Sequence, residues 1–434
     1  IGNGSYSTAD SYVKQVWDGR YTGIRMCNQL LENIDRVPDL DPELKKRYIG
    51  EAKVLRAYNY YELYTKFGDV PYTTKVLSIK ESMSIARTDR ATVIANMLAD
   101  LDEVINGNYL PASYDADNKG RITRWAAMAI KAKIYLFEGN WTQVKNITST
   151  IMTEGGFRLF GSYAGLFEIA NEYNSEVILD AQYRPTSREH QMMYAFLPPS
   201  LGGYSQLSPL QELVDSYIML DGKTIRETGT SFDESNPYAN RDPRLKATVM
   251  YTGNSYTLAD GTEVVINCEK GEGKDGYGVG SDCSATGYYI KKYWDNTYRA
   301  TLYSGLNPIL IRYADILLMN AEALAELGEL DKTAWDATIK PIRDRAGFTL
   351  ASAVEFPEGA SKDKLIEIVR NERRSELALE GHRHKDIIRW RIADDVLNGW
   401  CHGLKTNEVV GTDNGYVRVE NRAFNANKHY LWPI

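Results

Sequence analysis

The sequence predicts a mainly α-helical protein in which helical hairpins form a scaffold and one long irregular segment interrupts them. Two blocks of the chain carry apolar residues at helical spacing, and their helices end at glycines. The region between the blocks contains short strand candidates and long loops instead. We therefore expect a single domain over residues 1–434, with a helical scaffold in 41–156 and 305–398 and a loop-rich insertion with a few short β-strands in 157–304.

The first block contains one buried helix and one helical hairpin. Residues Glu51–Phe67 are apolar or aromatic on most sides, which predicts a buried helix that Gly68 stops. Residues Trp125–Gly139 and Trp141–Gly155 are typical of two helices joined by a tight turn, and alanines in the first of them permit close helix packing.

The second block repeats this hairpin design. Residues Leu310–Gly328 form a helix pattern rich in small residues, a Leu-Gly turn follows, and Asp331–Gly347 form a second helix pattern. The arrangement Ala-x-x-x-Leu-Gly with a following aromatic residue is loosely tetratricopeptide-like, with a period near the roughly 34 residues of that repeat. We expect these helices to act as a scaffold.

The insertion is expected to carry the binding side of the molecule. Segments Glu176–Tyr183 and Thr248–Tyr251 are strand candidates, and Asp260-Gly261 is a hairpin signal. Residues Lys270–Gly287 are rich in glycine and should form no regular element. Irregular insertions on a rigid scaffold are the usual place for binding surfaces.

The charge balance excludes some classes of partner. The chain has 51 basic and 58 acidic residues and a net charge of −7, which does not favour nucleic-acid binding. No run approaches the roughly 20 apolar residues that a membrane-spanning helix needs.

The cysteines do not form a metal-binding pattern. Cys27, Cys268, Cys283 and Cys401 include no C-x-x-C pair and have no histidine at zinc-ligand spacing, so we expect no metal. Cys268 and Cys283 flank the glycine-rich loop and are either a disulfide or two free thiols. The loop also contains a G-x-G-x-x-G sequence at 271–276, but no helix pattern follows it, so we expect no nucleotide cofactor.

The segment Lys364–Trp390 places charged residues where a helix should bury apolar ones. Glu372 and Glu376 fall inside an otherwise apolar helical stripe, and buried acids need partners. Arg373 and Arg374 lie in the same turn and Arg383 follows Gly381, a suitable helix end, so the segment could supply its own counter-charges.

A glycoside hydrolase is the catalytic alternative for the same carboxylates. Acids at positions i and i+4 of a helix lie about 5 to 6 Å apart, comparable to the pair of a retaining glycosidase. One acid of such a pair must keep a raised pKa, whereas neighbouring arginines favour the ionised form. Structural ion pairing of Glu372 and Glu376 is therefore the preferred interpretation, and we expect no enzyme.

This charged segment resembles the C-terminal signature of the SusD/RagB family of Bacteroidetes outer-membrane lipoproteins. The family pattern is roughly E-R-R-x-E-L-A-F-E-G-H-R, then an aspartate and a basic-Trp pair. The matching residues are Glu372-Arg373-Arg374-Ser375-Glu376-Leu377-Ala378-Leu379-Glu380-Gly381-His382-Arg383, Asp386 and Arg389-Trp390. Three further segments match in the family's order: Arg56-Ala57-Tyr58 leading to Phe67-Gly68-Asp69-Val70-Pro71-Tyr72, Ile311-Arg312-Tyr313-Ala314-Asp315-Ile316-Leu317-Leu318-Met319, and His429-Tyr430-Leu431-Trp432-Pro433-Ile434.

The resemblance implies a SusD-like α/α superhelix and a non-catalytic, surface-exposed protein that binds oligo- or polysaccharides. It further implies delivery of the glycan to a SusC-like TonB-dependent outer-membrane transporter. The family's leader and lipidated cysteine are expected upstream of Ile1, and its members usually continue beyond Ile434. Some members handle peptides, which remains an alternative.

A surplus of tyrosine, 30 against 10 phenylalanines, extends into the insertion and suits a ligand surface that is apolar toward sugar faces and wet at its edge. The segment 293–299 offers an aromatic shelf beside an acid, an amide and a guanidinium. The predicted ligand-binding residues are Trp294, Tyr298, Asp295, Asn296, Arg299 and Tyr204. Packing of Trp294 and Tyr298 against the scaffold is the alternative, and Tyr6 is an outside candidate.

Overall fold

The computed structural model describes residues 7–297 and 302–433, and the chain forms two compact units. The first, here called the helical unit, consists of Ile1–Gly156, His384–Asn398 and Ala423–Ile434. The second, the mixed unit, consists of Phe157–Arg383 and Gly399–Arg422. The chain therefore enters the mixed unit twice, at Phe157 and at Gly399, and returns to the helical unit after each passage. The segment expected to continue the scaffold, 305–398, is divided between the two units.

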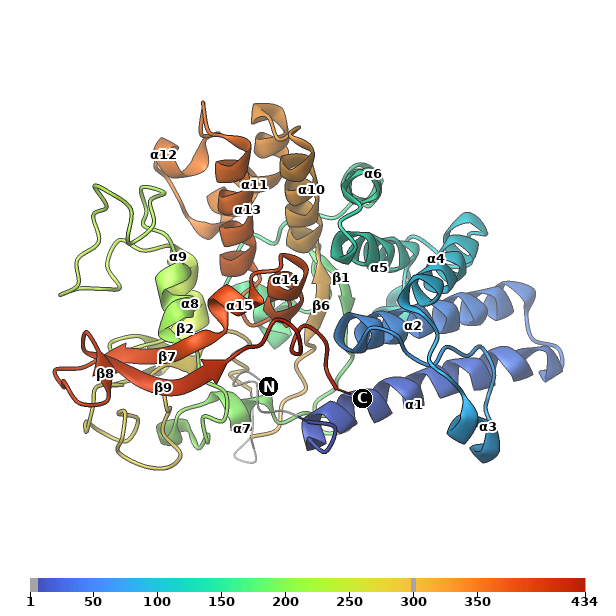
Figure 1. Cartoon of the computed structure of the whole chain (residues 1–434), viewed down its shortest axis with the longest axis horizontal. Coiled ribbons are helices and arrows are strands. Elements are labelled where there is room, and N and C mark those ends of the chain that lie inside the picture. Colours follow the sequence, from blue (N-terminus) through green and yellow to red (C-terminus); the bar gives the residue numbers. More distant parts are fainter. Residues whose placement is uncertain (1–6, 298–301, 434) are drawn as a thin grey trace. The chain divides into compact units, whose positions relative to one another are not determined.

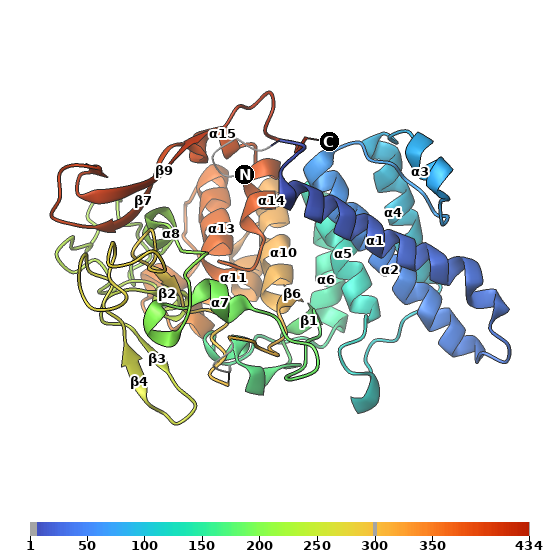
Figure 2. The ribbon, with the colours of Figure 1, turned by 90° about the horizontal axis from the view of Figure 1, so that it is seen from below.

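The helical unit is built from antiparallel helices that lie side by side (Figure 2). Its longest helix starts at Pro42, earlier than predicted, because Asp41 caps it and proline fits the first turn; it ends at Gly68, whose φ is 72°. The predicted hairpin is confirmed. The helices are α1 (Ser11–Asn33), α2 (Pro42–Phe67), α3 (Ile79–Ser84), α4 (Arg90–Asn106), α5 (Arg124–Phe137), α6 (Trp141–Glu154), α15 (Ala393–Val396) and most of α14 (Arg383–Arg389).

The mixed unit contains the second predicted hairpin, which is also confirmed. Its helices pack together through α10 and α13 (Figure 1). They are α7 (Met192–Phe196), α8 (Gln211–Ser216), α9 (Pro243–Thr248), α10 (Tyr313–Leu327), α11 (Lys332–Ala346), α12 (Ala351–Val354) and α13 (Lys362–Glu376). The mainly α-helical prediction is thus correct.

In the part of the mixed unit that the structure describes, the strands form four small sheets, in which β1–β6, β2–β5, β3–β4 and β8–β9 pair antiparallel. The β3–β4 hairpin forms at the predicted Asp260-Gly261 turn, and the two predicted strand segments contain β1 and β2. The sequence analysis missed β5 to β9. The strands are β1 (Val177–Asp180), β2 (Val249–Met250), β3 (Ser255–Thr257), β4 (Glu263–Val265), β5 (Tyr289–Ile290), β6 (Ile309–Arg312), β7 (Asn398–Lys405), β8 (Thr412–Asp413) and β9 (Tyr416–Ala423).

Two predicted helix limits were wrong. Leu310 to Arg312 do not begin a helix, because they belong to β6 and pair with β1, with Leu179 opposite Ile311. The helix expected to run to Gly381 ends at Glu376. The Glu376 carbonyl oxygen accepts hydrogen bonds from Arg312 Nη2 at 2.7 Å and from the Tyr163 hydroxyl at 3.2 Å, so side chains replace its helical partner.

The glycine-rich loop behaves as expected, since no helix or strand forms between β4 and β5. All four cysteines are free. Cys283 donates a hydrogen bond from Sγ to the Lys274 carbonyl at 3.2 Å, and Cys268 is buried elsewhere, so the alternative of two free thiols is correct. Within residues 7–297 and 302–433, no helix has the length and apolar character needed to span a bilayer.

Candidate ligand-binding cleft

The acids of the charged segment lie in a buried ion-pair cluster of the mixed unit. Glu376 is its centre: Arg312 Nη1 lies 2.6 Å from one carboxylate oxygen, Arg244 Nη1 lies 2.8 Å from the other, and Arg345 also contacts it. The acidic members of the cluster are Glu176, Asp242, Glu372, Glu376 and Glu380; the cationic members are Arg244, Lys292, Arg312, Arg343 and Arg345. The formal charges of the two sets balance.

Two of the arginines that the sequence analysis expected as partners contact other groups. Arg373 pairs with Asp315 at 2.6 Å, and Arg374 donates to the Glu212 carbonyl. Residues adjacent in a helix point to different faces, so Arg373 and Arg374 cannot turn back onto the stripe that carries Glu372 and Glu376. The counter-charges come from other elements, such as Arg312 at the end of β6.

The cluster is unsuited to catalysis. Burial raises the pKa of Glu376, but the positive charges of Arg345, Arg312 and Arg244 lower it more, and the net pKa lies well below its usual value. Burial also raises the pKa of Glu380, but the positive charges of Arg312 and Lys292 lower it more, and the net pKa falls to about 2. Both side chains are at most 1% exposed, so no sugar could reach them. Structural ion pairing accounts for these acids better than a glycosidase does.

The predicted aromatic shelf is partly used for packing. Trp294 is half-buried, lies against the Tyr256 ring at 4.9 Å between centroids, and donates from Nε1 to the Thr257 carbonyl at 2.8 Å. Asp295 is buried and accepts hydrogen bonds from the Ser304 hydroxyl at 2.5 Å and the Thr297 amide at 2.9 Å. The Asp295 carboxylate therefore holds its own loop together.

Two of the predicted residues reach solvent. Asn296 is exposed, and Tyr204 is 42% exposed while one of its faces stacks on Tyr194 at 4.2 Å between centroids. Tyr298, Arg299 and the outside candidate Tyr6 lie outside the described residues. The shelf residues remain predictions.

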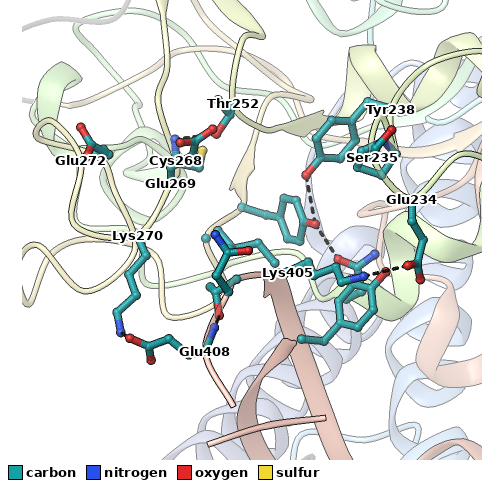
Figure 3. A pocket seen from close by; sticks show the side chains of 18 of the residues that line it. Glu234, Ser235, Tyr238, Thr252, Cys268, Glu269, Lys270, Glu272, Lys405 and Glu408 are labelled. Carbon is teal, nitrogen blue, oxygen red and sulfur yellow. Dashed lines mark hydrogen bonds and ion pairs between the residues drawn. The ribbon is translucent and has the colours of Figure 1, made fainter. Parts of the chain in front are cut away.

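A different group of residues forms an open cleft of about 820 Å³ in the mixed unit (Figure 3). Its walls come from segments far apart in the sequence: the loop after α8, the residues around Cys268 that follow β4, and the strands β7 and β9. The lining side chains combine tyrosines with charged and amide groups: Gln211, Glu234, Tyr238, Glu269, Lys270, Glu272, Tyr288, Lys405, Asn407, Glu408 and Tyr416.

A chain of hydrogen bonds fixes the tyrosines of one wall (Figure 3). The Tyr288 hydroxyl donates to Gln211 Oε1 at 2.5 Å, and Gln211 Nε2 donates to the Asp215 carboxylate at 2.7 Å. The Tyr238 hydroxyl lies 3.2 Å from that of Tyr288, and its ring stacks on Tyr251 at 3.9 Å between centroids. The rings are therefore held in place before any ligand arrives.

Lysine–glutamate pairs lie on opposite sides of the cleft. Lys405 Nζ lies 2.8 Å from the Glu234 carboxylate, and Lys270 contacts Glu408 (Figure 3). These four side chains are between 39% and 63% exposed, unlike those of the buried cluster. The lining residue Cys268 is no nucleophile at neutral pH, because burial raises the pKa of its thiol to about 12.

Two glycines allow β7 to form a wall of the cleft. The Leu404 amide donates to the Thr286 carbonyl at 2.7 Å, which brings the two backbones together. A Cβ at Gly287 would lie 1.7 Å from Leu404 Cδ2, and a Cβ at Gly403 would lie 2.5 Å from the Thr286 oxygen. Only glycine fits this approach.

His402 ties the same strand to α8 and β8. Its Nδ1 lies 2.8 Å from Glu212 Oε1 and its Nε2 lies 3.0 Å from Asp413 Oδ2. Burial lowers the pKa of His402, but the hydrogen bonds to Asp413 and Glu212 raise it more, and the net pKa lies above its ordinary value. The protonated imidazole can donate to both carboxylates, so it helps to position the strand beside the cleft.

Sequence reasoning found part of this cleft's composition but not its position. Tyr238 and Tyr288 belong to the tyrosine surplus of the insertion, yet they were not among the selected residues. The contributions of β7 and β9, including Lys405 and Tyr416, were missed altogether. Alternating polar residues in 398–423 are the one local signal that could have predicted strands there.

Comparison with known proteins places the chain in a family. The model described as the SusD family matches residues 166–434, and one described as starch-binding and associating with the outer membrane matches residues 2–136. The SusD-like protein P25 of Formosa agariphila is 28% identical over 410 residues, which cover 89% of this chain and 71% of that protein.

Solved structures agree with this assignment. A SusD-like carbohydrate-binding protein from Bacteroides fragilis superimposes with a TM-score of 0.89 and 29% identity, over 100% of this chain and 85% of the other. A laminarin-binding SusD-like protein superimposes with a TM-score of 0.64 and 25% identity, over 88% of this chain and 79% of the other. Family match, homologues and fold agree: this chain belongs to the SusD family.

Proposed function

We propose that this protein is a non-catalytic, cell-surface binder of oligo- or polysaccharides that delivers them to a SusC-like TonB-dependent outer-membrane transporter. The observation that carries the proposal is the cleft of the mixed unit, in which tyrosine rings held by hydrogen bonds stand beside charged and amide side chains. Sugars need both features, since their C–H faces stack on aromatic rings and their hydroxyl groups form hydrogen bonds.

The relatives support this choice of ligand. One similar structure is a carbohydrate-binding protein and another binds laminarin, and one matching family model is described as starch-binding and associating with the outer membrane. Attachment to that membrane through a lipid on a segment upstream of Ile1 belongs to the proposal, as does the transporter partner.

The predicted shelf is proposed as a second contact for a long glycan. Tyr204 has an exposed face, Trp294 is half-buried, and Asn296 is exposed beside the buried Asp295. We include Tyr298 and Arg299 in this contact on the sequence pattern alone. A polysaccharide chain that extends out of the cleft could touch such residues without any covalent step.

Affinity electrophoresis tests the proposal. The protein is run through native gels that contain laminarin, starch, xylan, mannan or dextran, and retardation by at least one of them is expected. Tyr416→Ala should weaken that retardation about tenfold, since stacking on one ring contributes roughly 0.5–1.5 kcal/mol beyond area burial. Tyr416→Phe should keep most of it if the ring carries the contact.

The control is Tyr109→Ala in the helical unit, because this tyrosine is half-buried like Tyr416 and lies outside the cleft. Tyr204→Ala and Trp294→Ala test the second contact in the same gels. Binding of peptides with no retardation by any glycan would contradict the proposal, as would release of reducing ends from a bound glycan.

A further inference from the structure

We infer that the cleft selects its glycans by charge: it accepts uncharged chains and rejects chains that carry carboxylate or sulfate groups. This inference rests on the proposed glycan binding and names the class of ligand. Two independent features of the lining support it, namely its excess of carboxylates and the direction of its hydrogen bonds.

The lining carries more negative than positive side chains. Its carboxylates are Glu234, Glu269, Glu272 and Glu408, and its ammonium groups are Lys270 and Lys405. Each lysine is already paired within the cleft, Lys405 with Glu234 and Lys270 with Glu408. An anionic sugar would therefore have to displace a glutamate to reach a cation.

The remaining acids are exposed and uncompensated. Glu269 and Glu272 are exposed, and neither forms an ion pair with any residue that the structure describes. They belong to the loop that follows β4, on the side of the cleft where Lys270 reaches across to Glu408 (Figure 3). A carboxylate or sulfate brought into the cleft would meet these charges at short range.

The tyrosine wall presents acceptors rather than donors. Asp215 only accepts hydrogen bonds, so the amide nitrogen of Gln211 points to it and the amide oxygen receives the Tyr288 proton. The single hydroxyl proton of Tyr288 is then used, and Tyr238 must donate in the Tyr238–Tyr288 bond. Both phenolic protons are engaged inside the wall.

A wall that accepts hydrogen bonds suits an uncharged sugar, whose hydroxyl groups can donate them. A sugar hydroxyl can donate to the oxygen of Tyr238, which is only half-buried, and to the exposed glutamates, whereas an ionised carboxylate or a sulfate ester has no proton to donate. The same wall that favours hydroxyl groups therefore adds to the electrostatic penalty on anionic groups.

Chemically matched ligands test the inference. Laminarin, starch or mannan, whichever retards the protein, is compared with the same polymer whose primary hydroxyl groups have been oxidised to carboxylates, and with the methyl ester of that product. Xylan and dextran have no primary hydroxyl groups along the chain, so their carboxymethyl ethers and the methyl esters of those ethers take the place of the oxidised forms. The oxidised polymer should bind at least about fivefold more weakly at low ionic strength, given the strength of one contact between like charges in water. The gap, meaning the difference between the affinities for the neutral and the oxidised polymer, should narrow at high salt because salt screens the repulsion. The methyl ester is uncharged and should bind like the neutral polymer.

A charge-matched pair of variants assigns the effect to the cleft. Glu269→Gln combined with Glu272→Gln removes two negative charges and keeps an amide oxygen that accepts hydrogen bonds at each position. The readout is the ratio of the affinities for neutral and oxidised polymer, which this variant should bring closer to one. Glu154→Gln combined with Glu358→Gln changes the net charge equally at exposed positions outside the cleft and should leave the gap unchanged. Circular dichroism confirms that each variant is folded.

The outcomes separate the two proposals. Neutral polymers that bind no better than their oxidised forms, or a gap that persists in the cleft variant, would overturn the charge selection and leave glycan binding intact. Retardation by anionic polysaccharides and by no neutral one would likewise overturn the charge selection and leave glycan binding intact. Retardation by no polysaccharide of either kind would refute the proposed function and the charge selection with it.

Discussion

The buried cluster around Glu376 and the pairs at the cleft use the same chemistry in opposite surroundings. In the cluster, Arg312, Glu376 and Glu380 are at most 1% exposed, and each contacts more than one opposite charge. At the cleft, Lys405 and Glu234 are 39% and 63% exposed and form one pair. The difference shows that burial, not residue type, decides whether a charge belongs to the architecture or is accessible to a ligand.

Solvent explains the contrast. A buried ion that loses its partner keeps the cost of desolvation, whereas an exposed one is rehydrated by water. The cluster joins β6, α9 and α13, and we expect each single substitution in it to destabilise the fold, whereas substitutions at the exposed pairs should leave the fold intact.

The largest effect is expected in the cluster. Arg312→Ala leaves Glu176, Glu376 and Glu380 with a buried negative excess and should lower the free energy of unfolding by about 3–5 kcal/mol. Urea denaturation followed by tryptophan fluorescence measures it. Arg226→Ala removes an 83% exposed arginine paired with Asp215 and serves as the control, which should unfold like the wild type. Equal losses of unfolding free energy in both variants would show that burial does not decide the cost of removing a charge.

The next effect concerns the backbone contact that positions β7. Gly287→Ala introduces a Cβ 1.7 Å from Leu404 Cδ2 at a φ of 74°, and we expect a loss of about 1–3 kcal/mol of stability together with weaker glycan retardation.

Gly261→Ala is the matched control, because its φ is 84° and no atom lies within 4 Å of its added Cβ. It carries the backbone strain without the clash. Adding Leu404→Ala to Gly287→Ala should recover part of the lost stability; no recovery would mean that contact with Leu404 is not the cause.

A smaller effect should depend on pH. The pKa of His402 lies above its ordinary 6.5, so the protonated form is favoured by folding. Its contribution is fully present below about pH 6.5 and is lost as the pH rises through the raised value. The stability difference between wild type and His402→Gln should therefore shrink from pH 5.5 to pH 9, as measured by urea midpoints.

His429→Gln, in the helical unit, controls for general effects of losing an imidazole. A difference between wild type and His402→Gln that stays constant over this range would show that the bonds to Glu212 and Asp413 do not depend on protonation.

The smallest effect is expected at the cleft. Lys405→Ala breaks the pair with Glu234, and solvent screening should keep the loss of stability below about 1 kcal/mol. The same variant adds an unpaired carboxylate to the cleft, so it should bind oxidised polysaccharide still more weakly while neutral polymer is retarded almost as before. A loss of stability comparable to that of Arg312→Ala would show that solvent exposure does not determine the cost of breaking an ion pair.

The sequence alone predicted what depends on local pattern. Apolar spacing and terminal glycines predicted the α5–α6 and α10–α11 hairpins, and the order of four motifs predicted the family. It also predicted that the acids of Lys364–Trp390 would be paired in the interior. Helical periodicity and chain-ordered motifs can be read over short spans, because they depend on neighbours in sequence.

The tertiary structure alone decided which residues contact one another across long distances in sequence. The counter-charges of Glu372 and Glu376 come from Arg244, Arg312, Arg343 and Arg345 instead of the adjacent arginines, and the pairing of β1 with β6 turned a predicted helix start into a strand. The cleft unites α8, the loop after β4 and the strands β7 and β9, which no local pattern connects. Contacts between residues so distant in sequence depend on how whole elements pack, because that packing determines which side chains leave water together.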